Sequence, residues 1–320
     1  MTIKLTAGAA LALALMAGTA SAQETVLRAV SAFQLDTAIA EPFNAWVERV
    51  NEAGEGILRI EVIGGPETMP PFEVGNALRG GVVDLANTTA VYHANLVPEG
   101  LAMTLTDKKM PELRENGGYQ LLDDIHMRKA GIHWLGRLSE GMKYYIYLAK
   151  EPTDLKFEGL NIRSAPTYQA FFTALGINPM QTAAGEVFTA LERGTIDGYA
   201  WPSRGVFDLG WQEKTAARVE PGFYQVETGV YLSARSWENL GEPQKQFLQE
   251  QMLAWEADGA DLTAAAEAEL QQQAEAGIAT VTLPEDEAAA FLALSIEEGW
   301  KPVVAANPEE GAKLRELYSE

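Results

Sequence analysis

The sequence predicts an α/β protein built from two similar lobes with a cleft between them. Strand-like and helix-like segments alternate twice along the chain, first in residues 26–86 and again in residues 143–202. Such alternation is typical of a mostly parallel sheet flanked by helices. A helix end followed by Gly-x-x-Asp also occurs in both halves, at residues 78–84 and 191–197. Two related units of this kind indicate two lobes, and we expect a ligand cleft between them.

The charge balance excludes several classes of function. The 320 residues include 24 Lys and Arg against 45 Asp and Glu, which gives a formal net charge of −21. So acidic a protein repels nucleic-acid phosphates and anionic lipid, and neither is expected as a partner. The hydrophobic share of 47% is enough for a sizeable core, and a chain of this length favours two domains.

Cysteine and histidine usage argues against a metal or thiol enzyme. The chain has no cysteine, which excludes disulfides, thiolate catalysis and cysteine metal sites. The three histidines are His93, His126 and His133, and their spacing matches no metal site. We therefore predict neither a metal nor another cofactor, and interpret the histidines as structural.

The first 22 residues have the features of a cleavable signal peptide. Lys4 precedes an apolar run over residues 5–17 that is too short to span a bilayer. Residues 20–22 (Ala-Ser-Ala) supply the small-x-small pattern of a cleavage site, so cleavage is expected before Gln23. The mature protein is then expected outside the cytoplasmic membrane, in the periplasm.

In the first half of the mature chain, three strands alternate with two helices. Asp36 is expected to cap the first helix, along which apolar side chains recur at helical spacing. The second helix is expected to begin at Pro70-Pro71 and to end before Gly80-Gly81. The strands are predicted at residues 26–30, 58–63 and 82–86, and the helices at residues 36–51 and 70–79.

In the second half, a strand that ends on a cation precedes two helices. That cation is Arg163, and Pro202 closes the last strand of the unit. The strands are predicted at residues 143–148, 159–163 and 195–201, and the helices at residues 168–175 and 185–193.

From Ser236 onward the sequence is predominantly helical. Ala, Glu and Gln, which favour helices, dominate residues 261–276, and no apolar heptad indicates a coiled coil. Residues 280–283 are predicted as a short strand, and residues 285–300 and 308–318 as helices.

Three motifs occur together in residues 159–202. They are Gly-Leu-Asn-Ile-Arg-Ser-Ala-Pro at 159–166, Gly-Ile-Asn-Pro at 176–179, and Gly-Glu-Val-Phe-Thr-Ala-Leu-Glu-Arg-Gly-Thr-Ile-Asp-Gly-Tyr-Ala-Trp-Pro at 185–202. In this combination the chain resembles the solute receptors of TRAP (tripartite ATP-independent periplasmic) transporters, of the dicarboxylate-receptor (DctP) type. The segment Ala-Leu-x-x-Gly-x-Val-Asp-Leu-Ala at 77–86 is similar to the first lobe of that family. The resemblance covers nearly the whole mature chain.

The resemblance implies a two-lobed periplasmic-binding-protein fold with discontinuous domains. The first lobe is expected to comprise residues 23–142 and 232–258, and the second residues 143–231 and 259–320, with the long helix after Ser236 spanning both. The resemblance also implies a receptor that catalyses nothing. It binds a small organic acid and delivers it to a membrane permease with a large and a small integral subunit. A monomer is expected, and a homodimer through a C-terminal helix is the alternative.

Arg163 is the principal candidate for ligand binding. A guanidinium at the carboxyl end of a parallel strand faces the crevice in which open α/β sheets bind ligands. Its planar fork also matches the geometry of a carboxylate. From residue type alone, an ion pair with a structural acid such as Glu186 is the alternative. The resemblance favours the ligand, because the arginine after Gly-Leu-x-Ile clamps the ligand carboxylate in that family.

Further candidates are expected around Arg163. Trp201 follows the Ile-Asp-Gly motif, and Ala200 stands where related 2-oxo-acid receptors carry a glutamate that helps to hold a metal, which argues against a bound cation. The resemblance implies that Lys143 is an auxiliary cation. Glu186 either caps its helix or orients Arg163. The remaining candidates come from loops and strand ends of the cleft and are Phe33, Gln34, Asn87, Thr88, Tyr92 and Phe207.

Signatures of enzymes are absent from the sequence. Residues 137–141 (Arg-Leu-Ser-Glu-Gly) lack the first glycine of a nucleophile elbow, and no Walker loop or dinucleotide fingerprint occurs. Three other functions stay open as alternatives: the receptor of an ABC-type importer, a ligand-sensing module of a signalling receptor, and a secreted hydrolase. The sequence does not identify the acid that is bound.

Overall fold

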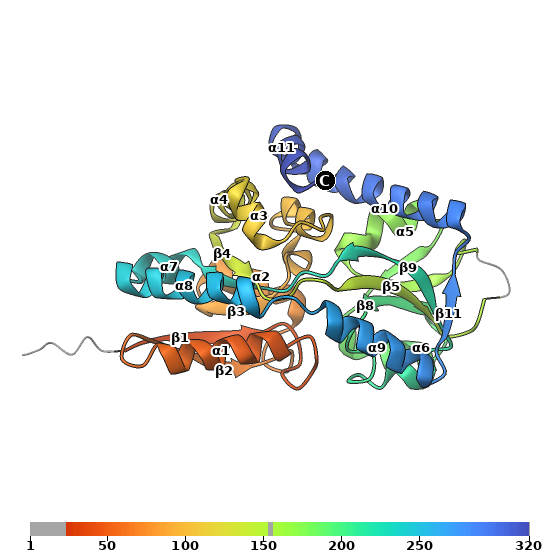
Figure 1. Ribbon diagram of the computed structural model, residues 1–320, viewed down its shortest axis with the longest axis horizontal. Coiled ribbons are helices and arrows are strands. Elements are labelled where there is room, and N and C mark those ends of the chain that lie inside the picture. Colours follow the sequence, from red (N-terminus) through yellow and green to blue (C-terminus); the bar gives the residue numbers. More distant parts are fainter. Residues whose placement is uncertain (1–23, 153–155, 320) are drawn as a thin grey trace, which may run out of the picture.

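The chain folds into two lobes that lie side by side, each built on its own β-sheet (Figure 1). The two-lobed α/β architecture predicted from the sequence is confirmed. The computed structural model describes residues 24–152 and 156–319, and the predicted signal peptide lies outside them. Within these described ranges, no helix combines the length and the apolar character that a bilayer crossing requires.

The first lobe contains a five-stranded sheet in which all strands but one point the same way. In spatial order the strands are β2 (Leu58–Gly64), β1 (Thr25–Ser31), β3 (Leu85–Thr88), β10 (Gly229–Ser233) and β4 (Ile132–Arg137). β10 runs antiparallel to both of its neighbours. The strands predicted at 26–30 and 58–63 are confirmed. The third starts at Leu85 rather than at residue 82, because Gly81 closes the preceding helix in the left-handed conformation (φ 66°) and residues 82–84 complete the turn.

Helices cover both faces of this sheet. On one face, α1 (Glu41–Ala53) and α8 (Glu242–Asp258) pack through a core in which Phe43, Trp46 and Met252 are fully buried. The other helical segments of the lobe are η1 (Pro71–Glu73), α2 (Val74–Gly80), η2 (Ala90–His93), η3 (Pro98–Thr104), α3 (Met110–Glu115), α4 (Gly118–Ala130) and α7 (Ala234–Asn239).

The first helix begins at Glu41, and the prediction that Asp36 caps it is wrong. Pro42 lacks an amide hydrogen and fits only the first turn of a helix, so the helix cannot begin several residues earlier. Residues 37–40 instead form a hydrogen-bonded turn, in which Ala40 N donates to Thr37 O over 2.9 Å. The longer loop that results reaches the cleft between the lobes.

The second lobe contains a six-stranded sheet in which β5 alone runs against the others. In spatial order the strands are β11 (Ala279–Thr282), β9 (Ala217–Gln225), β5 (Lys143–Leu148), β8 (Gly198–Pro202), β6 (Asn161–Ser164) and β7 (Asn178–Gln181). The bounds predicted for β5 are confirmed. β7 was not predicted, since it contains Pro179, and a proline is tolerated at the edge position that this strand occupies.

The helical segments of the second lobe follow the predicted order. The two helices predicted between β6 and β8 are confirmed, each beginning with a 3-10 turn. The segments are η4 (Pro166–Tyr168), α5 (Gln169–Ala174), η5 (Ala184–Glu186), α6 (Val187–Glu192), η6 (Trp211–Lys214) and α9 (Thr263–Glu275), and α10 (Glu285–Ala306) and α11 (Pro308–Tyr318) follow β11.

Three chain segments cross between the lobes and are hydrogen-bonded to one another. They comprise residues 138–142, 226–228 and 259–262. The bonds run from Leu138 N to Thr228 O (2.7 Å), from Val226 N to Met142 O (2.9 Å), from Glu140 N to Ala260 O (2.7 Å) and from Leu262 N to Glu140 O (2.9 Å). Three adjacent crossings of this kind are an arrangement about which two lobes can open and close as a hinge.

The prediction that one long helix after Ser236 spans both lobes is wrong. The helix is interrupted at residues 259–262, so that α8 lies in the first lobe and α9 in the second (Figure 1). Ala260 and Leu262 use their backbone groups to bond the crossing segment at Glu140. In addition, the carboxylate of Asp261 accepts a hydrogen bond from Thr263 N over 3.0 Å. The backbone hydrogen bonds to Glu140 replace those that a continuous helix would make at residues 259–262.

The structure also moves the expected lobe boundaries. β10 pairs with β3 and β4 over its whole length, so the chain returns to the first lobe before Gly229 and not at residue 232. Residues 259–320 do not all belong to the second lobe, because α11 packs on α4 and η3 of the first. The 22-residue helix α10 contacts α5 and β9 on one side and η3 on the other, so it is α10 that reaches both lobes (Figure 1).

Candidate functional site

A cleft with two connected chambers lies between the lobes. The outer chamber has a volume of about 230 Å³ and takes its walls from loops of both lobes. The inner chamber is about 20 Å³, enough for about one water-sized group. Phe33, Ile39, Tyr92 and Trp201 line both chambers, which makes the cleft continuous.

Arg163 lies at the inner chamber and is 1% exposed. It is the third residue of β6, so the strand carries its side chain to the edge of the sheet that faces the first lobe. Its Nε donates to Thr182 O over 3.0 Å and its Nη1 to Ala200 O over 3.3 Å. Nη2 is buried and makes no hydrogen bond of ordinary geometry with any described residue. A buried guanidinium with a free N–H favours an anion beside it.

Glu186 does not pair with Arg163 directly. Its carboxylate is exposed and accepts a hydrogen bond from the hydroxyl of Thr182, whose carbonyl oxygen in turn accepts from Arg163 Nε. The two residues therefore share Thr182 as a partner, and the alternative of a structural ion pair between them is not what the structure contains. Glu186 is the N-cap residue of α6, but its side chain makes no capping hydrogen bond, so the prediction that it caps the helix is not supported.

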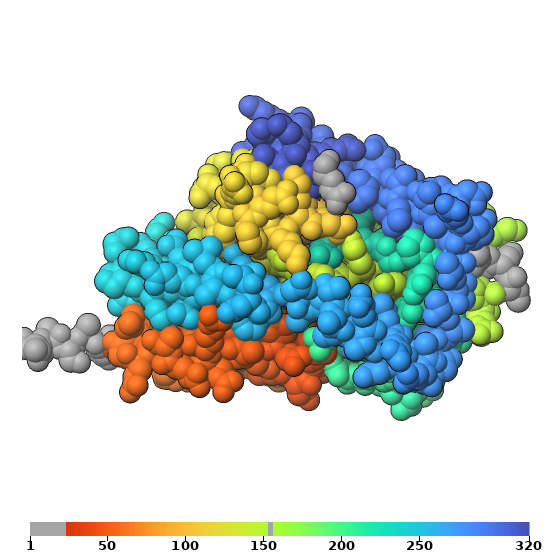
Figure 2. All heavy atoms as spheres, in the orientation of Figure 1, coloured from red at the N-terminus to blue at the C-terminus, as the bar shows by residue number. Residues whose placement is uncertain are grey.

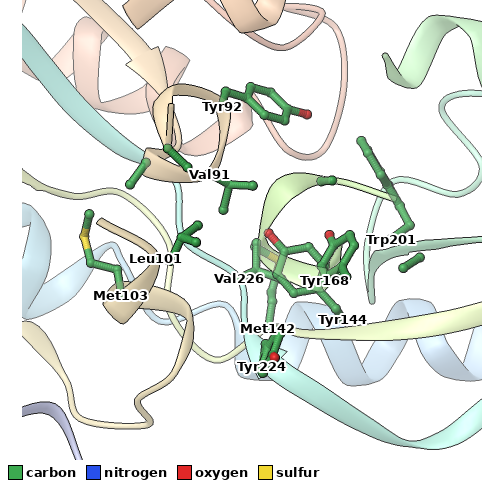
Figure 3. Close-up of a cluster of buried hydrophobic side chains, with 14 of the residues drawn as sticks. Val91, Tyr92, Leu101, Met103, Met142, Tyr144, Tyr168, Trp201, Tyr224 and Val226 are labelled. Carbon is green, nitrogen blue, oxygen red and sulfur yellow. The ribbon is translucent and has the colours of Figure 1, made fainter. Parts of the chain in front are cut away.

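Three tyrosines surround the inner chamber together with Trp201. Figure 3 shows the rings of Tyr92 and Trp201 projecting toward a space beside Tyr144 and Tyr168. Burial raises the pKa of all three phenols, and the positive charge of Arg163 offsets part of that rise. The hydroxyl groups therefore stay protonated at neutral pH, and those of Tyr144 and Tyr168 interact with each other.

Glu227 is an acid of the inner chamber that the sequence pattern did not single out. It lies on the second crossing segment, is 1% exposed, and accepts hydrogen bonds from Thr89 Oγ1 (2.9 Å), Ala90 N (3.0 Å) and Tyr231 OH (2.9 Å). Burial raises its pKa, although the bond from Ala90 N offsets part of the rise. A signal was present in the sequence, since Glu227 is the lone charge in the otherwise uncharged run 223–233.

The structure brings four of the predicted wall residues to the cleft. Phe33, Gln34 and Trp201 line the outer chamber as expected, and Tyr92 borders both chambers. The side chain of Trp201 also lies against the cation, with Arg163 Cζ 5.3 Å from the ring centroid.

Three other candidates lie close to the cleft without lining it. Asn87 and Thr88 are buried within β3, where Asn87 Nδ2 donates to Ser31 Oγ over 3.1 Å, and it is the next residue, Thr89, that borders the inner chamber. Phe207 is half-buried outside the chambers, whereas Gly205 and Leu209 line the outer one.

Lys143 lies away from the cleft, so its predicted role as an auxiliary cation is not supported. Side chains alternate along a strand, and in β5 Tyr144 faces the inner chamber while Lys143 faces the other way. Lys143 forms an ion pair with Asp107 and lines a separate cavity of about 400 Å³. Figure 2 shows that face hollowed where segments of β5 and β9 are visible below α10.

The histidines serve packing and hydrogen bonding. His93 and His126 are buried with their ring centroids 5.5 Å apart, and burial lowers the pKa of both. His133 Nδ1 lies 3.0 Å from the carboxylate of Asp123. Over the described parts of the chain, no three His, Asp or Glu side chains converge as metal ligands.

The pKa of Glu227 leads to a testable dependence of stability on pH. Because burial raises its pKa in the folded protein above the usual 4.5, ionising this carboxyl costs folding free energy, and stability is lost as the pH rises through the folded-state pKa. We expect Glu227→Gln to gain stability relative to the parent protein between about pH 4 and about pH 7. Urea unfolding of both proteins over this range measures the difference.

The exposed acid Glu316 provides the control for this measurement. Glu316→Gln removes a carboxylate that is 69% exposed, so its stability relative to the parent is expected to change little over the same range. If the free energy of unfolding of Glu227→Gln, relative to that of the parent protein, falls as the pH rises, ionising the buried Glu227 does not cost folding free energy.

Comparison with protein families gives a match over most of the chain. A model of the family described as bacterial extracellular solute-binding protein, family 7 (DctP), matches residues 30–301. The chain is 26% identical over 210 residues to the monocarboxylate 2-oxoacid-binding periplasmic protein of Nostoc sp., an alignment that covers 60% of this chain and spans 56% of that protein. It is 28% identical over 204 residues to the C4-dicarboxylate-binding protein DctB of Bacillus subtilis, which covers 61% of this chain and spans 54% of DctB.

Solved structures share the fold at low sequence identity. A TRAP periplasmic solute binding protein from Desulfovibrio desulfuricans, with bound sn-glycerol-3-phosphate, superposes with a TM-score of 0.80 at 19% identity and covers 92% of this chain and 98% of its own. DctP7 of Bordetella pertussis, an extracytoplasmic solute receptor binding pyroglutamic acid, has a TM-score of 0.78 at 16% identity, with coverages of 92% and 100%. These likenesses establish the two-lobed fold.

Proposed function

Since the chain belongs to family 7 of the bacterial extracellular solute-binding proteins, we propose that it is the periplasmic receptor of a TRAP transporter, which captures a small organic acid and delivers it to a membrane permease. One observation carries the assignment of the ligand. Arg163 is 1% exposed, it borders the inner chamber between the two lobes, and its Nη2 makes no hydrogen bond of ordinary geometry with a described residue. A carboxylate would satisfy that group.

Ligand capture follows from the hinge and from contacts that already join the lobes. Across the cleft, Ala38 N donates to Asp208 Oδ2 over 2.6 Å, and the hydroxyls of Thr104 and Thr167 lie 2.8 Å apart. A ligand that touches Arg163 on one lobe and Phe33 on the other adds its own contacts to this closed arrangement. Because it binds the closed state better than the open one, it shifts the population toward closure.

The ligands of solved relatives support an organic acid. Those structures were determined with bound orotic acid, D-glucuronate or pyroglutamic acid, and each of these molecules has a carboxyl group. The curated relatives bind monocarboxylate 2-oxoacids or C4-dicarboxylates. These ligands share a carboxylate, whereas the sn-glycerol-3-phosphate of the Desulfovibrio desulfuricans structure is an anion of another kind, and an arginine can bind either group.

Membership of the family supports delivery of the ligand to a membrane permease and a periplasmic location of the receptor. The receptor acts in the periplasm as a monomer after removal of the signal peptide, and it docks on a permease with a large and a small integral membrane subunit. It carries out no reaction on its ligand. It functions without a metal, because Ala200 occupies the position at which a glutamate would serve as a ligand.

A thermal-shift screen of organic acids on the purified mature protein tests this proposal. A true ligand at about 100 times its Kd stabilises the fold by about 2.7 kcal/mol, a shift of several degrees in Tm. Neutral amides of the same acids are the control and are expected to leave Tm unchanged. If no acid in a broad panel shifts Tm, or if the protein hydrolyses esters or glycosides, the proposal fails.

A further inference from the structure

We infer that the cleft selects an organic acid with one carboxylate and an apolar body about the size of a single ring. The inference rests on the proposed function and adds to it the class of ligand. It follows from the charges, the walls and the volume of the two chambers.

The chambers contain a single cation. Among the described residues that line either chamber, Arg163 is the only basic side chain and Glu227 the only acidic one. Lys143, the second cation expected from the sequence, is paired with Asp107 in another cavity. One guanidinium whose Nη2 group makes no hydrogen bond of ordinary geometry with a described residue matches one carboxylate.

The walls of the outer chamber are mainly apolar. Most of the surface comes from aromatic, aliphatic and proline side chains of both lobes. The hydroxyl of Thr37 is not free to donate a hydrogen bond to a ligand, since it already donates to Gln34 O over 2.6 Å. The Nε1 of Trp201 is buried without a partner and can donate one further hydrogen bond. The apolar wall residues include Phe33, Ile39, Pro71, Ala184, Trp201 and Leu209.

These walls disfavour a second charge or a set of hydroxyl groups on the ligand. A second carboxylate would leave water for an apolar chamber that has no second cation, and such burial is costly. The carboxyl group of Glu227 adds repulsion on the inner side. In the outer chamber, the hydroxyl groups of a sugar acid would find few polar partners beyond Gln34, Tyr92 and the indole of Trp201, and each unpaired polar group lowers affinity.

The volume limits the apolar part of the ligand. At about 230 Å³, the outer chamber is smaller than the roughly 300–1,000 Å³ of typical pockets for drug-sized ligands. A single ring or a branched chain of similar size fills such a space. The flat faces of Phe33, Tyr92 and Trp201, which line it, suit a ring.

Matched pairs of acids test the inference on the unmodified protein. Calorimetric titration compares hexanoate with adipate, which adds a second carboxylate, and cyclohexanecarboxylate with glucuronate, which adds hydroxyl groups. We expect the apolar member of each pair to bind at least about tenfold more tightly, the effect of leaving one polar group unpaired. Benzamide, which lacks the carboxylate, is expected not to bind.

A gain-of-function variant supplies the missing cation. Leu209 lines the outer chamber and is half-buried, so Leu209→Lys can place an ammonium group there. We expect this variant to shift the preference between hexanoate and adipate toward adipate by about tenfold. Val82→Lys adds the same charge at a site that is 63% exposed and lines neither chamber, and it is expected to keep the original preference.

The outcomes separate this inference from the proposed function. If adipate or glucuronate binds more tightly than its apolar partner, and Arg163→Ala abolishes that binding, the inference is overturned while the receptor function stands. If no acid of the broad thermal-shift panel binds, the proposed function itself fails. If Arg163→Ala keeps the original affinities, Arg163 does not bind the carboxylate, and this inference fails while a receptor function remains. The comparisons on the unmodified protein decide between these outcomes even where Leu209→Lys does not fold.

Discussion

Arg163→Ala is expected to weaken the binding of an organic acid by at least about 30-fold. Losing one partner of a buried, hydrogen-bonded charge pair costs about 2–5 kcal/mol, which corresponds to a factor of about 30 to a few thousand in Kd. The side chain is 1% exposed and has a free Nη2 beside the inner chamber, so water cannot replace it for the ligand. Calorimetric titration of the acid found in the thermal-shift screen measures the loss.

Two further variants define the role of the guanidinium. Arg163→Lys keeps the charge but loses the planar fork that also bonds Thr182 O and Ala200 O, so an intermediate affinity is expected. Arg193→Ala removes an exposed arginine of the same lobe and is expected to bind as the parent does. If Arg163→Ala and Arg193→Ala bind the acid with equal affinity, Arg163 does not bind the ligand carboxylate.

Glu256→Ala is expected to lower the free energy of unfolding by about 3 kcal/mol. Glu256 on α8 is the buried partner of Arg114, with Oε2 2.7 Å from Nε and Oε1 2.9 Å from Nη2, and its side chain is 1% exposed. It also accepts a hydrogen bond from Arg137 N over 3.2 Å. Removing one member of a buried pair leaves an uncompensated charge and costs about 3–5 kcal/mol, and the partial exposure of Arg114 places this case at the lower end.

Urea denaturation measures this effect, with an exposed pair as the control. Glu316 lies 2.9 Å from Lys313, and both side chains are more than half exposed. Glu316→Ala is expected to change the free energy of unfolding by less than about 0.5 kcal/mol. A loss for Glu256→Ala no larger than that of the control would mean that the bidentate pair contributes little to docking α8 on the sheet.

The local pattern of the sequence was sufficient for much of the fold. Alternation and the runs of β-branched and aromatic residues predicted β1, β2 and β5 nearly to the residue. The pattern failed where tertiary hydrogen bonds override propensity. Residues 259–262 lie between two segments rich in helix formers, yet their backbone groups bond Glu140 across the hinge. No window of local sequence contains that partner.

The candidate site was predictable in the same uneven way. Arg163 could be identified because it ends a strand within a specific motif, and the chamber around it takes Phe33 and Trp201 from the expected segments. The position of Lys143 could not be predicted from its distance along the chain. Lys143 and Tyr144 are consecutive residues of β5, and because side chains alternate along a strand, Lys143 lies on the opposite face of the sheet.

By itself, the sequence determined the two alternations of strands and helices that build the lobes and the acidic character of the protein, and it indicated Arg163 as the candidate cation of the site. These properties depend on short-range patterns and on composition. Only the tertiary structure decided which side chains share the cleft, that Glu227 borders it from a crossing segment, and that Arg163 is the one cation among the described residues that line it. Contacts of this kind join residues far apart in the chain, and their geometry is fixed by how the two lobes meet at the hinge.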